Sequence, residues 1–250
     1  MKNSKDNVRF LSDSDSKMLA AGEPHYRSYV GPPSRYDLMG AAQFRLLTTL
    51  GLRDFHRVLD FGCGSLRAGR MLIAYLQKAC YYGIEPNQWL ITDAIDRQLG
   101  QDLINLKQPS FSSNSDFTVP FIKYPFDFVL AQSIFSHTGR NIARKLILEF
   151  AKVLSPFGIV AATFSLQECS NDSKEEGWVY PQCVKYSYEN VLLMVKEAGL
   201  VGARIPFYHP TQSWFLFAKD INRLPSHDLQ WILSGAVFNV DEFSESLKKP

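Results

Sequence analysis

The stretch RVLDFGCGSLRAGR, residues 57–70, decides the fold. A short apolar run ends in Asp60, and two glycines follow it as Gly62 and Gly64. The next residues, SLRAGRMLIAYLQ, have the apolar spacing of an amphipathic helix, for which Ser65 is the predicted N-cap. A strand, a glycine turn and a helix in this order predict the entry to a nucleotide pocket in an α/β protein.

Strands and helices continue to alternate around this stretch. Apolar runs predict strands at 57–61, 80–84, 126–135 and 159–165, and amphipathic spacing predicts helices at 38–52, 65–77, 87–100, 140–154 and 187–200. The adjacent segments 201–210 and 211–220 predict an antiparallel hairpin. The pattern indicates a doubly wound, mostly parallel sheet with helices on both faces and a C-terminal antiparallel strand. In such a sheet the ligand binds beyond the carboxyl ends of the strands.

The composition limits the class of protein. Of the 250 residues, 46% are hydrophobic and 21% are charged, which favours a sizeable core over disorder. A formal net charge of +2 argues against a strongly basic nucleic-acid-binding protein. With neither an apolar signal region nor a stretch of membrane-spanning length, the chain is expected to be cytoplasmic. Its four cysteines form no CxxC pair and no zinc-type cluster, so we expect reduced thiols and no metal site.

The glycine turn departs from two common nucleotide motifs. A dinucleotide fingerprint requires a third glycine where this chain has Arg67, and the Gly-Lys-Ser/Thr of a P-loop does not follow. Asp60 would repel a pyrophosphate and favour a ligand with a positive centre and an ammonium group, as in S-adenosylmethionine. Gly62 and Gly64 would let the backbone approach this ligand, and the helix N-terminus at Ser65 would receive its carboxylate.

A second acidic residue, Glu85, follows the next predicted strand. Its carboxylate can accept hydrogen bonds from both ribose hydroxyls of a nucleoside. Dehydrogenases use an acidic residue in the same way, so Glu85 alone does not discriminate between cofactors. Asp60 and Glu85 together favour S-adenosylmethionine and disfavour a nicotinamide oxidoreductase.

In these motifs the chain resembles the class I S-adenosylmethionine-dependent methyltransferases. The resemblance covers roughly residues 40–218 and is carried by VLDFGCGSLRAG (58–69), GIEPN (83–87), SDF (115–117), FDFVLAQSIFSH (126–137) and two later segments, EFAKVLSPFGIVAATF and YSYENVLLMVKEAGL. It implies a seven-stranded sheet whose last strand is antiparallel. It also implies S-adenosylmethionine as the methyl donor and S-adenosylhomocysteine as the product.

The resemblance further implies which residues hold the cofactor. They are expected to line its methionine part (Asp60, Gly62, Gly64), to hold its ribose (Glu85), to border the adenine (Pro86 or Asn87, Asp116 and Phe117), and to lie near the transferring methyl group (Gln132 and Ser133). Alternatives remain open at this stage: Asp116 as a turn residue, Gln132 as a solvated loop amide, and Arg67 as either a partner of the cofactor carboxylate or a surface residue.

Methyl transfer requires positioned reactants more than a fixed catalytic motif, so the sequence is less informative about the reaction centre. His137 follows the predicted strand 126–135 closely and is the candidate general base, with loop ordering as the alternative. Gln132 is the second candidate catalytic residue. His209, on the hairpin link, is expected to be structural or exposed. LAQSIF replaces the Asn/Asp-Pro-Pro-aromatic motif that enzymes of this family acting on amide or exocyclic amino nitrogens often carry.

Aromatic residues gather in two segments that could flank the pocket. In 177–188, Trp178, Tyr180 and Tyr186 are expected either to contact an apolar or aromatic substrate or to pack their loop onto the body. Tyr26 lies in an N-terminal leader that would form a lid over the cofactor or pack loosely.

These observations predict three parts: a leader and lid at 1–39, a methyltransferase domain at 40–220, and a helical tail at 221–250 that packs on the domain or on a partner. The predicted activity is transfer of a methyl group from S-adenosylmethionine to an oxygen or nitrogen of a small molecule. The alternative is a methyltransferase-like binding or interaction module without turnover, and a homodimer is a further option for the tail.

Overall fold

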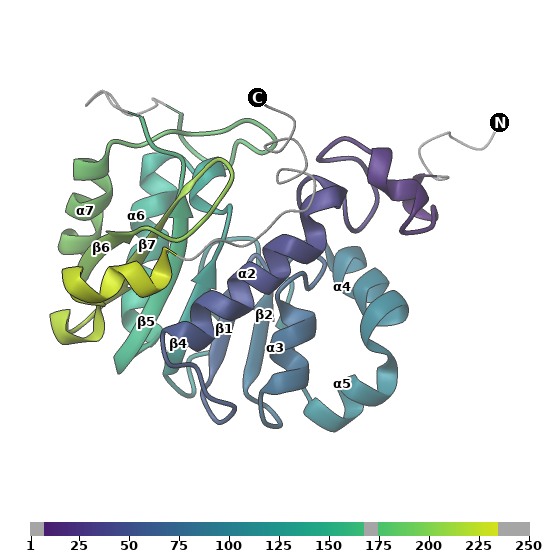
Figure 1. Cartoon of the computed structure of the whole chain (residues 1–250), viewed down its shortest axis with the longest axis horizontal. Helices are drawn as coiled ribbons and strands as arrows, with labels where there is room; N and C mark the ends of the chain where they lie inside the picture. The colour runs from purple at the N-terminus through teal and green to yellow at the C-terminus, as the bar shows by residue number, and fades with distance from the viewer. Residues whose placement is uncertain (1–7, 168–174, 235–250) are drawn as a thin grey trace, which may run out of the picture.

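Seven strands form one sheet in the described part of the chain, residues 8–167 and 175–234 of a computed structural model (Figure 1). The strands are β1 (Val58–Phe61), β2 (Tyr81–Ile84), β3 (Ser110–Ser112), β4 (Phe126–Ala131), β5 (Leu154–Phe164), β6 (Val201–Ile205) and β7 (Ser213–Ala218). They lie in the order β3-β2-β1-β4-β5-β7-β6. Strands β1 to β5 pair in parallel, and β7 runs antiparallel to both β5 and β6. The predicted sheet, including its antiparallel strand, is confirmed.

Helices cover both faces of the sheet. They are α2 (Tyr36–Thr49), α3 (Gly69–Tyr75), α4 (Gln88–Ala94), α5 (Gln101–Lys107), α6 (Arg140–Val153) and α7 (Tyr188–Glu197). Shorter turns are η1 (Asp15–Met18), η2 (Pro33–Arg35), η3 (Ile95–Leu99), η4 (Phe135–His137), η5 (Ile221–Arg223) and η6 (His227–Leu233). Side chains of α6 and α7 share one core cluster with the sheet, and those of α2, α3 and α4 share the other.

The central strand β4 shows why the sheet needs helices on both sides. Val129 and Ala131 belong to the cluster under α6 and α7, whereas Phe128 and Leu130 belong to the cluster under α2 and α3. Successive side chains of a strand point to opposite faces, so a continuous apolar run is buried on both. The helices cover the two faces of the sheet, so a ligand site is expected at the carboxyl ends of the strands, where polar residues follow.

The helix after β1 begins later than the sequence predicts. Helix α3 starts at Gly69, and Ser65 is not its cap. The backbone has positive φ at Gly62, Gly64 and Leu66 (70°, 54° and 55°), which interrupts helical geometry until the turn is complete. Ser65 is fully buried, and its hydroxyl lies 3.3 Å from the Tyr36 hydroxyl.

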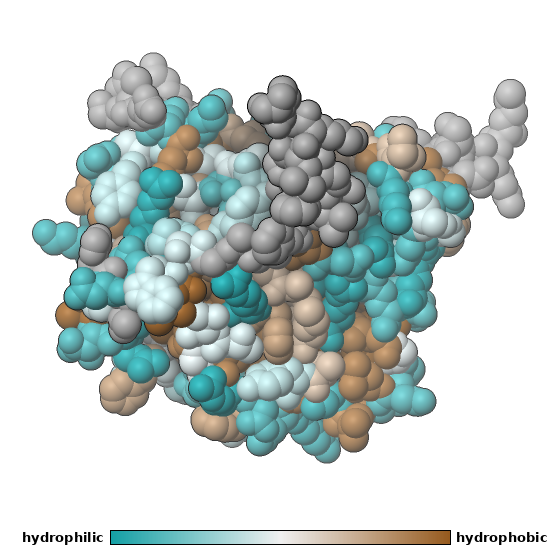
Figure 2. All heavy atoms as spheres, in the orientation of Figure 1, coloured by the Kyte–Doolittle hydropathy of each residue, from teal (hydrophilic) through white to brown (hydrophobic). Residues whose placement is uncertain are grey.

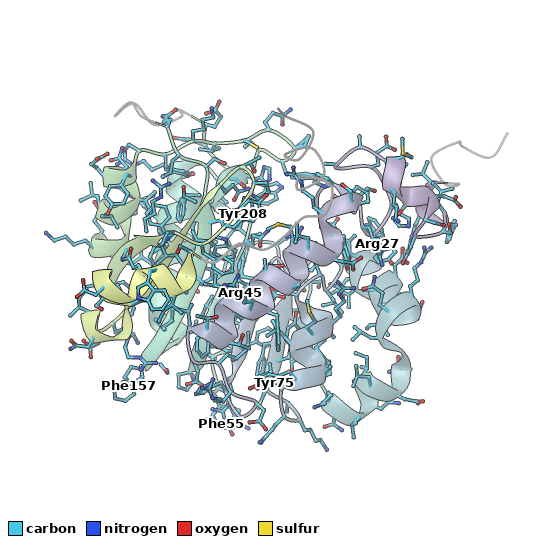
Figure 3. All side chains as sticks on the ribbon, viewed as in Figure 1. Arg27, Arg45, Phe55, Tyr75, Phe157 and Tyr208 are labelled. Carbon is cyan, nitrogen blue, oxygen red and sulfur yellow. The ribbon has the colours of Figure 1, made fainter. Side chains whose placement is uncertain are left out.

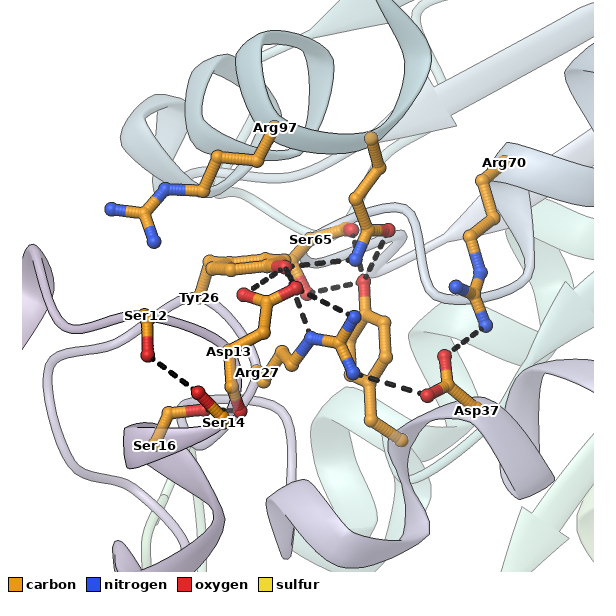
Figure 4. A network of polar contacts seen from close by, with 12 residues as sticks. Ser12, Asp13, Ser14, Ser16, Tyr26, Arg27, Asp37, Ser65, Arg70 and Arg97 are labelled. Carbon is orange, nitrogen blue, oxygen red and sulfur yellow. Dashed lines mark hydrogen bonds and ion pairs between the residues drawn. The ribbon is translucent and has the colours of Figure 1, made fainter.

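The N-terminal leader is fastened to the domain by a polar network (Figure 4). The Arg27 guanidinium contacts Asp13 at 2.8 Å and Asp37 at 3.1 Å, and Asp37 also pairs with Arg70 at 2.6 Å. The Tyr26 hydroxyl donates to the Asp13 carboxylate at 2.7 Å. The pair of Asp37 with Arg70 joins this network to the body, and Arg9 of the leader also pairs with Asp93 at 2.8 Å.

The C-terminal segment is described only as far as residue 234. Its turn η6 is a 3-10 helix, and Leu224 and Leu233 are buried against the cluster under α2 and α3. The remaining tail, with Val237 and Phe238 of the predicted helix, lies outside the described residues, as does Cys169. The other three cysteines form no disulfide. Polar and apolar side chains are interspersed over the face seen in Figure 2. No helix in the described residues is long and apolar enough to cross a bilayer.

Candidate active site

A cavity of about 610 Å³ lies where β1, β2 and β4 end. Residues that directly follow these strands, Gly62, Glu85 and Gln132, form part of its wall. The leader, the segment 178–183 and the β6–β7 link complete it. A volume of this size is typical of small-molecule pockets, which usually measure about 300–1,000 Å³.

The β6–β7 link belongs to this end of the molecule although it is distant from the glycine turn in sequence. Figure 3 shows Tyr208 of the link at the upper end of the sheet, while Phe55 and Phe157 lie at the lower end. Because β7 is antiparallel to β5, the chain enters β7 at the edge where the parallel strands finish. The antiparallel strand therefore adds residues to the site.

Asp60 is a buried carboxylate in the cavity wall, with 4% of its surface exposed. The Tyr81 hydroxyl donates to it at 2.8 Å. Burial raises the Asp60 pKa to about 6, against the lowering effects of Tyr81 and of the positive charge on Arg67. A cation bound beside Asp60 would lower this pKa and so stabilise the charged form of the side chain.

Glu85 is held by three N–H groups. Its Oε1 accepts from the Asn87 backbone N–H at 2.8 Å and the Asn87 side-chain N–H at 2.9 Å, while Oε2 accepts from the Gly64 N–H at 3.2 Å. Burial raises the pKa of Glu85, and these hydrogen bonds oppose that rise. The carboxylate is therefore fixed in direction at the cavity wall.

The glycine turn forms a close cradle between β1 and the leader. A Cβ at Gly64 would lie 2.6 Å from Val30 Cγ1, and one at Gly62 would collide with the Ile134 side chain. Both positions have positive φ, so glycine is required by conformation and by space. The side chains of Val30 and Ile134 pack against these glycines and line the cavity with them.

Arg67 is not a surface arginine. It lines the cavity, and its Nη1 donates to the Val30 carbonyl at 2.9 Å while its Nε donates to Gln43 Oε1 at 3.3 Å. Burial lowers the pKa of Arg67, and the charge of Asp60 acts in the opposite direction. The guanidinium therefore places positive charge in the wall and ties the leader to α2.

After β3 the structure corrects one expected contact. Asp116 does not line the cavity: its carboxylate is exposed and accepts from the Thr118 backbone N–H at 2.8 Å and hydroxyl at 2.6 Å. Those local hydrogen bonds lower the pKa of Asp116. Its neighbours Ser115 and Phe117 line the cavity instead. Asp116 is the turn residue that the alternative interpretation described.

Gln132 and Ser133, after β4, both line the cavity. Ser133 has φ of 60°, its N–H donates to Thr163 Oγ1 at 2.8 Å, and its hydroxyl accepts from Gln212 at 3.1 Å. Gln132 is buried, with 7% exposed, so it is not a solvated amide. Its Oε1 has no hydrogen-bond partner among the described residues.

His137 lines the cavity with one ring nitrogen committed to the protein. Its Nδ1 lies 2.6 Å from the Gln182 carbonyl oxygen, which can only accept, so Nδ1 carries the proton of the neutral ring. Nε2 then holds the lone pair. Burial lowers the pKa of His137, which favours this neutral form.

Two predicted aromatic residues reach the cavity and two do not. Trp178 and Tyr180 line it, with their rings 6.2 Å apart and near-parallel, and each packs edge-on against His137. Tyr186 is fully buried and donates its hydroxyl to the Thr138 carbonyl, and Tyr26 is fully buried against Asp13. Both rings are buried in the protein interior, so neither lines the cavity.

The sequence predicted the leader as a lid, but it did not identify Val30 and Gly31 of the leader, or the residues of the hairpin link, as cavity residues. Tyr29, Val30 and Gly31 line the cavity, and the Tyr180 hydroxyl donates to the Tyr29 carbonyl at 2.9 Å. His209 also lines it, contrary to the expectation of a structural or exposed residue. The antiparallel strand was the available signal for His209, because it returns the chain to the carboxyl end of the sheet.

Comparison with known proteins agrees with this geometry. Residues 59–160 match a family model described as a methyltransferase domain. No curated protein matches the chain significantly.

Solved structures show the same fold. A magnesium protoporphyrin IX methyltransferase from Synechocystis, solved with S-adenosylhomocysteine, aligns with a TM-score of 0.58 and 13% identity over 75% of this chain and 85% of that one. The glycopeptide N-methyltransferase MtfA aligns with a TM-score of 0.55 and 11% identity over 72% of this chain and 90% of that one. A TehB-like methyltransferase from Corynebacterium glutamicum aligns with a TM-score of 0.51 and 16% identity over 72% of this chain and 88% of that one.

At these identities the structural matches establish the fold, and the family model adds the methyltransferase domain that contains the glycine turn, Glu85 and Gln132. Neighbours with this fold have been solved with S-adenosylmethionine and with S-adenosylhomocysteine. Residues 59–160 therefore match a methyltransferase domain, and the chain has the fold of methyltransferases that bind S-adenosylmethionine.

Proposed function

We propose that this methyltransferase acts on an oxygen or nitrogen of a small molecule that enters the cavity. The observation that carries the proposal is that two buried carboxylates, Asp60 and Glu85, line the same cavity as His137, whose Nε2 is free to accept a proton. A cavity of about 610 Å³ suits a cofactor and a compact acceptor, and not a folded macromolecule.

The residues present fit the cofactor. The glycine cradle would take its methionine part, with Asp60 facing the positive charges, and Glu85 would accept from the ribose hydroxyls. Pro86 and Asn87 would border the adenine, together with Phe117 and Ser115 in place of Asp116. When bound, S-adenosylmethionine supplies an electrophilic methyl group on a sulfonium.

This chain's own groups would then position the acceptor and remove its proton. Gln132 and Ser133 would lie beside the transferring carbon, because they follow the central strand β4. Trp178 and Tyr180 would contact an apolar or aromatic body. His137 Nε2 would take the proton of the attacking hydroxyl or amine as the new bond to carbon forms, with Gln182 fixing the tautomer.

The leader 1–39 would act as a lid of this pocket. Ala21 and residues 29–32 line the cavity, and Val30 packs on the glycine cradle. The methyltransferase domain would occupy 40–220. The segment 221–250 would serve as a tail that packs on this domain, as Leu224 and Leu233 do in its described part.

Calorimetric titration with S-adenosylhomocysteine tests the proposal, with NADH as the comparison ligand. We expect micromolar binding of the first and no binding of the second. A panel of phenols, amines and carboxylic acids with a labelled methyl donor then tests turnover. Absence of S-adenosylhomocysteine binding would refute the assigned pocket, and label found only in macromolecules would refute the small-molecule acceptor.

A further inference from the structure

The link between β6 and β7 places a second histidine in the same cavity. His209 is half-buried there, and the reaction proposed above does not use it. Its Nδ1 accepts from two backbone N–H groups, those of Thr211 at 3.2 Å and Gln212 at 3.0 Å. A nitrogen that accepts in this way holds the lone pair, so the proton of the neutral ring is on Nε2.

The two cavity histidines therefore have opposite tautomers. His137 donates a hydrogen bond from Nδ1–H to the Gln182 carbonyl and has a basic Nε2, whereas His209 carries its proton on Nε2. His137 is an acceptor and His209 is a donor. A ring whose Nδ1 is occupied and whose Nε2 carries a proton has no lone pair left for a general base.

The surroundings keep His209 neutral. Burial lowers its pKa to about 3, and the positive charges of Arg67 and Arg35 act in the same direction. Arg67 belongs to the turn before α3 and Arg35 to η2 before α2, and both line the cavity. The amide of Gln132 faces the ring from the end of β4. The donor therefore lies in a region of positive potential.

Gln132 adds a second, independent observation. The amide is nine-tenths buried, and its Nε2 lies 3.4 Å from His209 Nε2. Two donors thus face each other at a long distance, while Gln132 Oε1 has no hydrogen-bond partner among the described residues. In the orientation seen here the two N–H groups can converge on one oxygen atom, and buried donors of this kind are normally matched by an acceptor.

We propose that His209 and Gln132 together bind an anionic oxygen of the methyl acceptor, so that the acceptor is a carboxylic acid. The inference rests on the function proposed above and narrows its substrate class. A fixed neutral N–H, a buried amide and two arginines in one wall suit a carboxylate, since hydrogen bonds to charged groups are the stronger ones. The aromatic pair Trp178 and Tyr180 would contact the rest of the molecule. A carboxylate also exists at the amino-acid end of the cofactor, and the test must separate the two sources.

The tautomer is measured directly by two-bond ¹H–¹⁵N correlation spectra of histidine-labelled full-length protein. His209 is assigned by loss of its signals in His209→Gln. We expect the Nε2–H tautomer between pH 5 and 8, without titration, and the opposite tautomer for His137. Titration of His209 near pH 6.5, or a proton on Nδ1, would overturn the inference.

Binding is measured with benzoate as the probe and benzyl alcohol as its uncharged match, on protein saturated with S-adenosylhomocysteine. His209→Gln keeps an N–H near the Nε2 position, whereas His209→Leu removes it. We expect benzoate to bind the wild type and the Gln variant within about threefold, and the Leu variant at least about tenfold more weakly. Benzyl alcohol should not distinguish the three proteins. Failure of benzoate to bind the wild type, or equal binding to the Leu variant, would overturn the carboxylate assignment.

A last comparison separates the acceptor from the cofactor. 5′-Methylthioadenosine lacks the amino-acid end that S-adenosylhomocysteine carries. If His209→Leu weakens S-adenosylhomocysteine about tenfold and leaves 5′-methylthioadenosine unchanged, the carboxylate belongs to the cofactor and the acceptor assignment is wrong. If S-adenosylhomocysteine fails to bind the wild type, the proposed function fails, and the tautomer spectra still decide the state of His209.

Discussion

Asp60 is buried at the end of β1, and a cationic ligand would recover the charge that burial disfavours. We expect Asp60→Asn to weaken S-adenosylhomocysteine binding by about 1.5–3 kcal/mol, the scale of a hydrogen bond to a charged group. Because the pKa of Asp60 is raised to about 6, wild-type affinity should fall as the pH drops below that value, and the Asn variant should lack this dependence. Calorimetry at several pH values measures both.

Asp116→Asn is the matched control for that experiment. Both aspartates were expected at the cofactor from sequence, but Asp116 is exposed and bonded to Thr118. Its substitution should leave the affinity unchanged. A loss equal to that of Asp60→Asn would mean that the loop after β3 moves onto the cofactor.

His137 is predicted to act through its free Nε2. His137→Ala should lower kcat by about a hundredfold, the usual contribution of a general base, without changing cofactor affinity. Burial lowers the pKa of His137, so the rate should fall on the acidic side only when the pH drops below that lowered value. A pH–rate profile with the turnover substrate checks this. His56→Ala, on the loop before β1, is the control, and full activity of His137→Ala would reduce the residue to loop ordering.

At the scale of elements, α6 holds one face of the sheet through few large side chains. Phe150 is fully buried, with ring centroids 5.4 Å from Phe61 and 6.3 Å from Phe135. Phe150→Ala should lower the free energy of unfolding by about 3–5 kcal/mol. Leu148 lies on the same helix with 45% exposed, and Leu148→Ala should cost less than about 1 kcal/mol. Urea titration measures the free energy of unfolding of both variants. Equal losses would mean that α6 does not bury its Phe150 face against the sheet.

At the scale of the whole molecule, His209 and Asp60 should change the free energy of unfolding in opposite directions as the pH is lowered. In the unfolded chain His209 takes up a proton below about pH 6.5, but the folded state resists protonation until about pH 3. The free energy of unfolding should therefore fall as the pH is lowered from about 6.5. The pKa of Asp60 is raised to about 6 in the folded state, whereas in the unfolded chain an aspartate loses its proton above about pH 4. The contribution of Asp60 to the free energy of unfolding therefore falls as the pH rises from 4 to 6.

Urea titrations at pH 7, 5.5 and 4.5 separate these contributions. Relative to the wild type, His209→Gln should lose stability more slowly on acidification, and Asp60→Asn should lose it faster. Parallel pH profiles for all three proteins would show that neither group keeps its shifted pKa in the native state.

The sequence alone determined the alternation of most strands and helices, the antiparallel closing strand and the cofactor class, but it missed α5 and β3. These depend on local features: apolar runs, amphipathic spacing, and an acidic residue beside glycines that need positive φ. They are read along the chain because strand alternation and turn conformation are set by near neighbours. For the same reason Asp60 and Glu85, at the ends of adjacent strands, were identified as neighbours in the site.

Only the tertiary structure decided which side chains reach the cavity. Ser65 packs under Tyr36, Tyr186 enters the core and Asp116 turns to solvent, although sequence position placed each near the ligand. His209 arrives from 149 residues beyond Asp60 because β7 returns antiparallel beside β5. The direction of a side chain at a strand end, and the tautomer of a histidine, depend on packing and hydrogen bonds from distant segments, and no local pattern records them.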